Sequence, residues 1–133
     1  MDVPHFTMLP LHESNRQTLG NIFWIRDDKD FTFIVGKAEI RIHKVILAAR
    51  SSFFAEMFTI IDSAENQIEN TDFDADVVQA AVEFCYDQNI TEFFKNTENS
   101  CSLFQFADKY DIADLKEILE RCLVTKLLPQ DIY

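Results

Sequence analysis

The sequence predicts an α+β domain in which a cluster of helices is flanked by a small sheet of short strands. An apolar share of 47%, with 13 phenylalanines, predicts an aromatic-rich interior rather than a disordered chain. Only 2 glycines and 3 prolines leave little material for the turns of a barrel, which favours helices. The 133 residues are enough for one domain with a single core.

Residues 31–42 carry the pattern of two short strands joined by a tight turn. In the first run Phe31 and Phe33 fall on one strand face and Ile34 falls on the other. In the second run Ile40 and Ile42 alternate with charged residues, which is the period of a half-buried strand. Gly36 lies between the runs and has the backbone freedom that a tight reversal requires.

The apolar period lengthens after residue 43, which predicts two closely spaced helices. Residues 45–49 suit a short buried helix, and residues 53–58 suit a second one. Ser51 and Ser52 lie at the junction and are favourable N-cap residues for the second helix.

The C-terminal half predicts one more strand and three more helices. The strand is expected at residues 67–69, and Thr71, Asp72 and Asp74 are candidate caps for the helix that follows. Residues 92–102 predict a turn or a ragged helix, with a regular helix beginning at Cys101 or Ser102. Asp111 is the predicted N-cap of a last long helix.

The N-terminal part differs from the rest of the chain in its residue pattern. Residues 1–12 lack periodicity and predict a flexible arm. A helix capped by Ser14 or Asn15 is expected over residues 13–25, with apolar side chains at helical spacing at Leu19, Ile22 and Phe23. These side chains are too apolar for an isolated exposed helix, so a dimer interface is predicted there. The domain then covers residues 13–126, and residues 127–133 predict the start of a following helix.

Charge and cysteine content narrow the classes of partner and compartment. The net charge of −11 disfavours nucleic acid and anionic membrane surfaces, which both attract clustered lysine and arginine. The 3 cysteines have no close pairing, which predicts a reducing compartment such as the nucleus or the cytoplasm. No apolar run reaches the roughly 20 residues of a membrane span, and no signal peptide is evident.

Sequence motifs of catalysis and of metal binding are absent. There is no glycine-rich phosphate loop, no nucleophile elbow and no paired histidine or cysteine motif, so the chain is not expected to be an enzyme. Asp72, Asp74, Asp76 and Glu83 match part of a calcium-loop template. Val77 occupies the position that requires glycine, so helix capping explains these acids better, and no cofactor or metal is predicted.

Two ordered motifs resemble the BTB/POZ domain. The first begins with Asp30 and a hydrophobic strand and continues as His43-Lys44-x-Ile46-Leu47-Ala48-Ala49-Arg50-Ser51. The second is Leu103-Phe104-x-Phe106-Ala107-Asp108-Lys109-Tyr110, with Leu115 and Cys122-Leu123 after it. Together with Leu19-Gly20-Asn21-Ile22-Phe23, the resemblance is closest to the speckle-type POZ (MATH-BTB) branch and covers about residues 17–126.

The resemblance implies a protein-interaction module that forms a homodimer. It places Leu19, Ile22 and Phe23 on a helix that packs across the dimer interface. It also places Asp30 and Lys44 near each other at the base of that interface; the alternative is that Asp30 only caps the first strand.

The resemblance further implies a substrate adaptor for a cullin 3 RING ubiquitin ligase. Cullin-binding members carry a hydrophobic residue and a glutamate after the second helix, and this chain has Ile60 and the shorter Asp62 there. Phe54 and Met57 are candidates for the adjoining apolar surface. The alternatives are an ordinary polar loop and a BTB domain used purely for oligomerisation, as a transcription-factor scaffold or a decoy. The substrate would be held by a domain that this chain does not contain.

Overall fold

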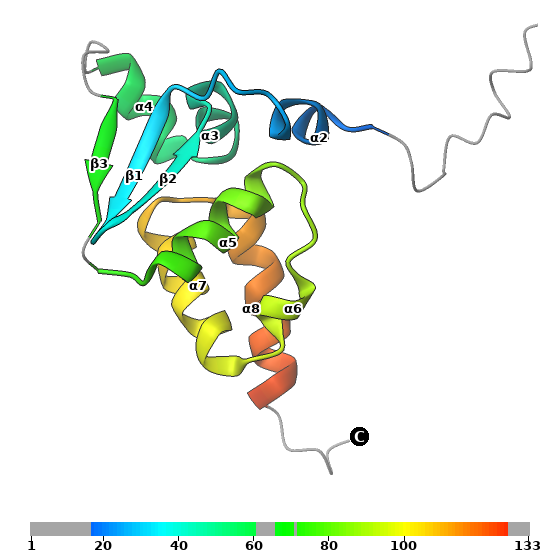
Figure 1. Cartoon of the computed structure of the whole chain (residues 1–133). Coiled ribbons are helices and arrows are strands. Elements are labelled where there is room, and N and C mark those ends of the chain that lie inside the picture. The colour runs from blue at the N-terminus through cyan, green and yellow to red at the C-terminus, as the bar shows by residue number, and fades with distance from the viewer. Residues whose placement is uncertain (1–16, 61–65, 71, 128–133) are drawn as a thin grey trace, which may run out of the picture.

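Three short strands lie at one end of the molecule and most of the helices at the other (Figure 1). The structure is a computed structural model, and it describes residues 17–60, 66–70 and 72–127. The strands are β1 (Phe31–Val35), β2 (Ala38–Ile42) and β3 (Gln67–Glu69). The helices are α2 (Leu19–Trp24), α3 (Lys44–Arg50), α4 (Ser52–Ile60), α5 (Ala75–Cys85), α6 (Thr91–Phe94), α7 (Thr97–Lys109) and α8 (Ala113–Leu127).

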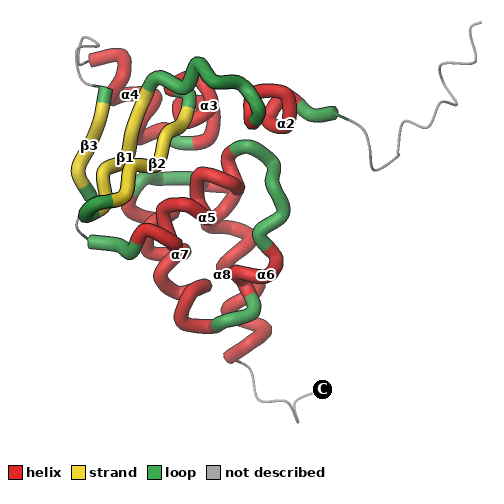
Figure 2. The backbone as a smooth tube through the Cα atoms, viewed as in Figure 1, coloured by secondary structure: helices red, strands yellow, loops and turns green. Residues whose placement is uncertain are grey.

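Strand β1 is the middle strand of the sheet, as Figure 2 shows in yellow. It pairs antiparallel with β2, so that Phe33 faces Ile40, and parallel with β3, so that Phe33 also faces Ile68. Gly36 has a φ of 61° in the turn between β1 and β2, where a side chain would be strained. The predicted α+β class and all three predicted strands are confirmed.

An aromatic cluster joins the sheet to the helices. Phe33 and Phe54 are fully buried, and their ring centroids lie 5.7 Å apart in an edge-to-face arrangement. Tyr110 stacks on Phe54 at 5.0 Å, and Phe106 lies 6.0 Å from Phe33. Burial of each of these rings removes apolar area from water, and this burial stabilises the fold by about 2 kcal/mol per ring. This cluster is therefore the centre of the core.

Asp87 and Asp111 end α5 and α7 in the left-handed conformation. Their φ angles are 63° and 53°. After α7, the amide of Asp111 donates to Asp108 and the amide of Ile112 donates to Ala107, which is the Schellman arrangement. The predicted N-cap role of Asp111 is therefore wrong: this residue terminates the preceding helix, and its carboxylate accepts a hydrogen bond from the Ser52 hydroxyl.

Two predicted helix starts are corrected. Helix α2 begins at Leu19, where Thr18 Oγ1 accepts from the Asn21 amide at 3.0 Å, while the predicted caps Ser14 and Asn15 lie outside the described residues. Helix α7 begins at Thr97 rather than at Cys101 or Ser102, because the Asn96 side chain accepts from the Asn99 amide. Within the described part of the chain, every helix is too short or too polar to cross a membrane.

Candidate protein-interaction surfaces

Helix α2 exposes an apolar face. The side chains of Leu19, Ile22 and Ile25 are 66%, 46% and 79% exposed, although all three are large and apolar. They recur every third residue, so they project from one side of the helical turn. Large apolar side chains grouped on a surface mark interaction sites.

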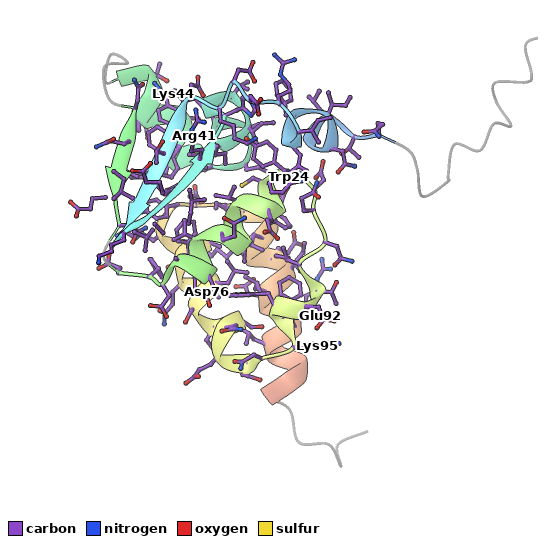
Figure 3. The ribbon with its side chains drawn as sticks, viewed as in Figure 1. Trp24, Arg41, Lys44, Asp76, Glu92 and Lys95 are labelled. Carbon is purple, nitrogen blue, oxygen red and sulfur yellow. The ribbon has the colours of Figure 1, made fainter. Side chains whose placement is uncertain are left out.

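The opposite side of α2 is fastened to the domain. Gly20 is buried against the end of α5, where an added Cβ would lie 2.4 Å from Asp87 Oδ2 and 2.7 Å from the Tyr86 carbonyl carbon. Gln88 Nε2 donates to Asn21 Oδ1 at 2.8 Å. Figure 3 labels Trp24 between α2 and the end of α5, and its ring lies 5.3 Å from that of Tyr86. The exposed face is thus held in a fixed position.

Helix α3 extends this apolar face. A groove of about 200 Å³ lies between α2 and α3, and Leu19, Ile46 and Ala49 contribute to its walls. Val45 is 61% exposed and lies one turn before Ala49 on the same side of α3. We call Leu19, Ile22, Ile25 and Val45 the α2 patch.

Phe23 lies on the inner side of α2 rather than in the α2 patch. It is half-buried, and its ring meets His43 edge-on at 5.0 Å. The guanidinium of Arg26 lies 5.5 Å above the same ring. Of the three predicted interface side chains on this helix, Leu19 and Ile22 face outward and Phe23 mainly anchors the helix.

Asp30 and Lys44 meet, but through a backbone group. The amide of Lys44 donates to Asp30 Oδ1 at 2.8 Å, so the carboxylate lies at the start of α3, where negative charge is favourable. The Lys44 ammonium instead donates to Asn66 Oδ1 at 2.9 Å and lies 5.5 Å from the Phe58 ring. Figure 3 labels Lys44 at the end of the molecule that carries α4.

A buried hydrogen-bonded chain at His43 supports the same corner. Its Nδ1 lies 2.7 Å from the Tyr86 hydroxyl and its Nε2 lies 2.7 Å from Asp28 Oδ1. The His43 amide also donates to the Tyr86 hydroxyl. Both ring nitrogens of His43 therefore have a hydrogen-bond partner, as does its amide, which gives His43 a structural role.

The pKa values of Tyr86 and Asp28 shift in opposite directions and for different reasons. Burial raises the pKa of Tyr86 to about 12, because the phenolate would lose hydration. Hydrogen bonds from Arg26 and then from His43 hold the pKa of Asp28 well below its usual range. Sequence reasoning missed Asp28 and Tyr86, since both lie far from His43 along the chain and no local pattern connects them.

Helix α4 buries most of its aromatic side chains. Phe54 is fully buried, so the structure places this predicted cullin contact in the core and not on a surface. Met57 is half-buried, and Phe53, one turn before it, is 42% exposed. We call Phe53 and Met57 the α4 face. The Ile60 backbone ends α4, while the Ile60 side chain and Asp62 lie outside the described part.

The acidic residues at the start of α5 have structural partners or helical positions. Asp72 Oδ2 accepts from Lys109 Nζ at 2.6 Å, and Asp76 already lies within α5, so these acids do not surround a common point. Among the residues that the structure describes, no group of three or more histidine, cysteine or acidic side chains could hold a metal ion.

Comparisons with known proteins agree with this architecture. Residues 22–127 match the family model of the BTB/POZ domain. Human Kelch-like protein 7 is 34% identical over 67% of this chain, and mouse TD and POZ domain-containing protein 3 is 34% identical over 74% of it. Caenorhabditis elegans BTB and MATH domain-containing protein 42 is 33% identical over 71% of the chain. The chain spans only 15%, 27% and 23% of the lengths of these three relatives.

A solved structure has the same fold. The BTB domain of zebrafish PATZ1 superposes with a TM-score of 0.61 at 20% sequence identity, over 73% of this chain and 76% of that domain. The relatives by sequence include both kelch-like and MATH-containing proteins, so a place in the speckle-type branch stays a prediction. The family match over most of the chain and the shared fold establish that the chain belongs to the BTB/POZ family of protein-interaction domains.

Proposed function

We propose that the chain is the homodimeric adaptor part of a cullin 3 RING ubiquitin ligase. The observation that carries the homodimer is the α2 patch, a group of large apolar side chains on a helix held against the domain, and the partly exposed α4 face supports the cullin contact. In this function the chain performs no chemistry. The homodimer would hold two copies of a substrate-binding domain beside the ligase, which raises the effective concentration of the substrate.

The dimer would form by pairing the α2 patches of two copies. Leu19 and Ile25 are the most exposed side chains of the patch, and their burial against a second copy would be favourable at about 25 cal/mol per Å² of apolar surface. Asp30 and Lys44 would contribute indirectly, because they set the start of α3, which carries Val45. Light scattering should give a mass that rises toward twice the monomer mass with concentration.

The α4 face and the segment after it are the proposed site for cullin 3. Phe53 and Met57 offer partly exposed apolar area on the helix that ends at Ile60. Ile60 and Asp62 are the residues that the family resemblance singles out. The test is titration calorimetry of the purified chain with the N-terminal region of cullin 3. We expect Ile60→Ala to weaken binding strongly and Phe53→Ala to weaken it less. The control is Val124→Ala, which changes an exposed apolar residue on α8 and should leave binding unchanged.

The alternative function is oligomerisation without cullin binding, as in a scaffold or a decoy. The α2 patch supports it equally, since that surface needs only a second copy. Absence of heat with cullin 3 at micromolar concentrations, together with a stable dimer, would favour this alternative and overturn the adaptor function.

Two further parts of the proposal concern the substrate-binding domain and the location in the cell. The substrate would bind to a domain outside this chain, such as the kelch or MATH regions named in the relatives. We also propose a nuclear or cytoplasmic location, supported by the free thiols of Cys85, Cys101 and Cys122.

A further inference from the structure

A second groove lies between α5 and α6, away from the α2 patch and the α4 face. Its floor is apolar and is made by Ala80 of α5, by Ile90 and by Phe93 of α6. Ala80 and Ile90 are buried within the domain and Phe93 is half-buried, so the floor belongs to rigid, packed structure. None of the interaction surfaces described above uses these residues.

The size of the groove indicates the kind of occupant. Its volume is about 290 Å³. This volume is at the lower limit of the roughly 300 to 1,000 Å³ of small-molecule pockets and is enough for one or two protein side chains. A short segment of polypeptide that inserts one apolar side chain between the helices fits this size.

The rim of the groove is acidic along one side of α5. Asp76 and Glu83 lie two turns apart on that side, and Glu92 approaches from α6. Gln79 Nε2 donates to Glu83 Oε2 at 2.8 Å, which orients the Glu83 carboxylate along the helix. Figure 3 labels Asp76 on α5 and Glu92 on α6.

Among the residues that the structure describes, one of these three carboxylates is paired with a cation. Lys95 Nζ lies 3.1 Å from Glu92 Oε2. In the described ranges, no lysine or arginine forms an ion pair with Asp76 or Glu83. These two carboxylates, which have no paired lysine or arginine among the described residues, give the rim of the groove a negative potential.

We propose that the groove between α5 and α6 binds a basic segment of a partner protein, with an apolar side chain on the floor and lysine or arginine beside Asp76 and Glu83. A second copy of this chain is a poor occupant because the surface proposed for self-association, the α2 patch, is apolar and offers no lysine or arginine to Asp76 and Glu83. The chain ends are poor occupants as well, since residues 1–16 and 128–133 together contain no lysine and one arginine, Arg16. Charge complementarity therefore selects a different, positively charged protein.

The test uses a fluorescein-labelled synthetic peptide with a central leucine pair flanked on each side by a lysine pair. Binding to the full chain is followed by fluorescence anisotropy at low salt, and the bound site is identified from amide shifts of Ile90 and Phe93 in NMR spectra. We expect the double variant Asp76→Asn, Glu83→Gln to weaken binding about fivefold, as two exposed ion pairs would. Asp76→Asn alone should give part of that loss and perturbs no internal contact.

Matched controls separate the groove from overall charge. Glu39→Gln with Glu120→Gln removes the same charge from exposed sites on β2 and α8, and binding should change less than about twofold. Equal weakening by both double variants would overturn the proposal, because attraction would then be nonspecific. Equally tight binding of a peptide with serine in place of leucine, or absence of binding at millimolar peptide, would also overturn it.

Discussion

Helices α2 and α4 both carry large apolar side chains. Helix α4 directs most of them into the core, whereas α2 exposes several of them to solvent. In α4, Phe54 lies at the centre of the aromatic cluster and only Phe53 is substantially exposed. In α2, Leu19 and Ile22 face outward, as does Ile25 just past its end, while Gly20 makes the close contact with the domain. Apolar content alone therefore does not decide which helix offers an interaction surface.

The difference comes from what covers the inner side of each helix. Helix α4 follows α3 after one residue and lies over the buried face of β1, so large rings are needed to fill the space. Helix α2 lies against the end of α5, where backbone approaches backbone and only glycine fits. Phe23 and Trp24 pack on the inner side beside this glycine, while Leu19 and Ile22 are left on the outer side, where a partner can use them.

The largest expected effect sharpens the contrast within α4. Phe54→Ala should lower the free energy of unfolding by about 3 to 5 kcal/mol, because it leaves a cavity among Phe31, Phe33 and Tyr110. Phe53→Ala should lower it by about 1 kcal/mol, since that ring is partly exposed. Urea unfolding measures both values. Similar losses for the two variants would contradict the assignment of Phe54 to the core and Phe53 to the surface.

A pair of glycine variants separates the docking of α2 from the stability of a turn. Gly20→Ala forces a Cβ against Tyr86 and Asp87 and should destabilise the docked helix by about 1 to 3 kcal/mol. Trp24 is the only tryptophan and packs on Tyr86, so its fluorescence should shift to longer wavelength. Gly36→Ala strains the β1–β2 turn at positive φ and should leave Trp24 emission unchanged. An unchanged emission in Gly20→Ala would refute the close docking of α2.

Tyr86 links α2 to α3, and its removal has a pH-dependent consequence. Tyr86→Phe leaves the buried His43 amide without its acceptor and should cost about 1 to 3 kcal/mol at neutral pH. The pKa of Tyr86 rises from 10.0 to about 12 on folding, so the folded state holds this proton more tightly than the unfolded state does. Stability contributed by the protonated hydroxyl is full below pH 10 and is lost as pH rises toward 12.

The alkaline loss has a second source that the variant retains. Burial raises the pKa of Cys85 from 9.0 to about 12, with the same sign. Unfolding free energies measured by denaturant titration from neutral to alkaline pH should therefore fall in both proteins, and less steeply for Tyr86→Phe above pH 10. Parallel curves would show that the Tyr86 hydroxyl is not buried in the folded state.

The local sequence pattern was sufficient to predict elements whose signal lies within one short segment. The period of β1 and β2, the glycine at position 36 and the short strand β3 were all predictable, since alternation and turn chemistry act within a few residues. The first turn of α7 was missed because its exposed residues are polar and give no apolar period. Asp111 was placed at the wrong helix because an aspartate between helices suits either end.

The residues of the candidate surfaces also divide into those that the local sequence pattern predicts and those that it does not. Leu19 and Ile22 were predictable as exposed apolar residues, whereas Ile25, which is the most exposed, lies just past the helix and was not selected. Phe53 and Phe54 are adjacent and chemically identical, so only the packing of α4 on the sheet distinguishes surface from core. The contact of Gly20 with α5 depends on residues far apart in the chain, which local pattern does not reveal.

Sedimentation equilibrium on the α2 patch tests the central claim most directly. Ile22→Asp places a charge within the patch without touching the core, so its effect on folding should be small, as circular dichroism would verify. The wild-type chain should sediment as a dimer at concentrations where Ile22→Asp is a monomer, and Val124→Asp on α8 should remain dimeric. A wild-type monomer at the highest concentration, or a dimer unaffected by Ile22→Asp, would contradict the account.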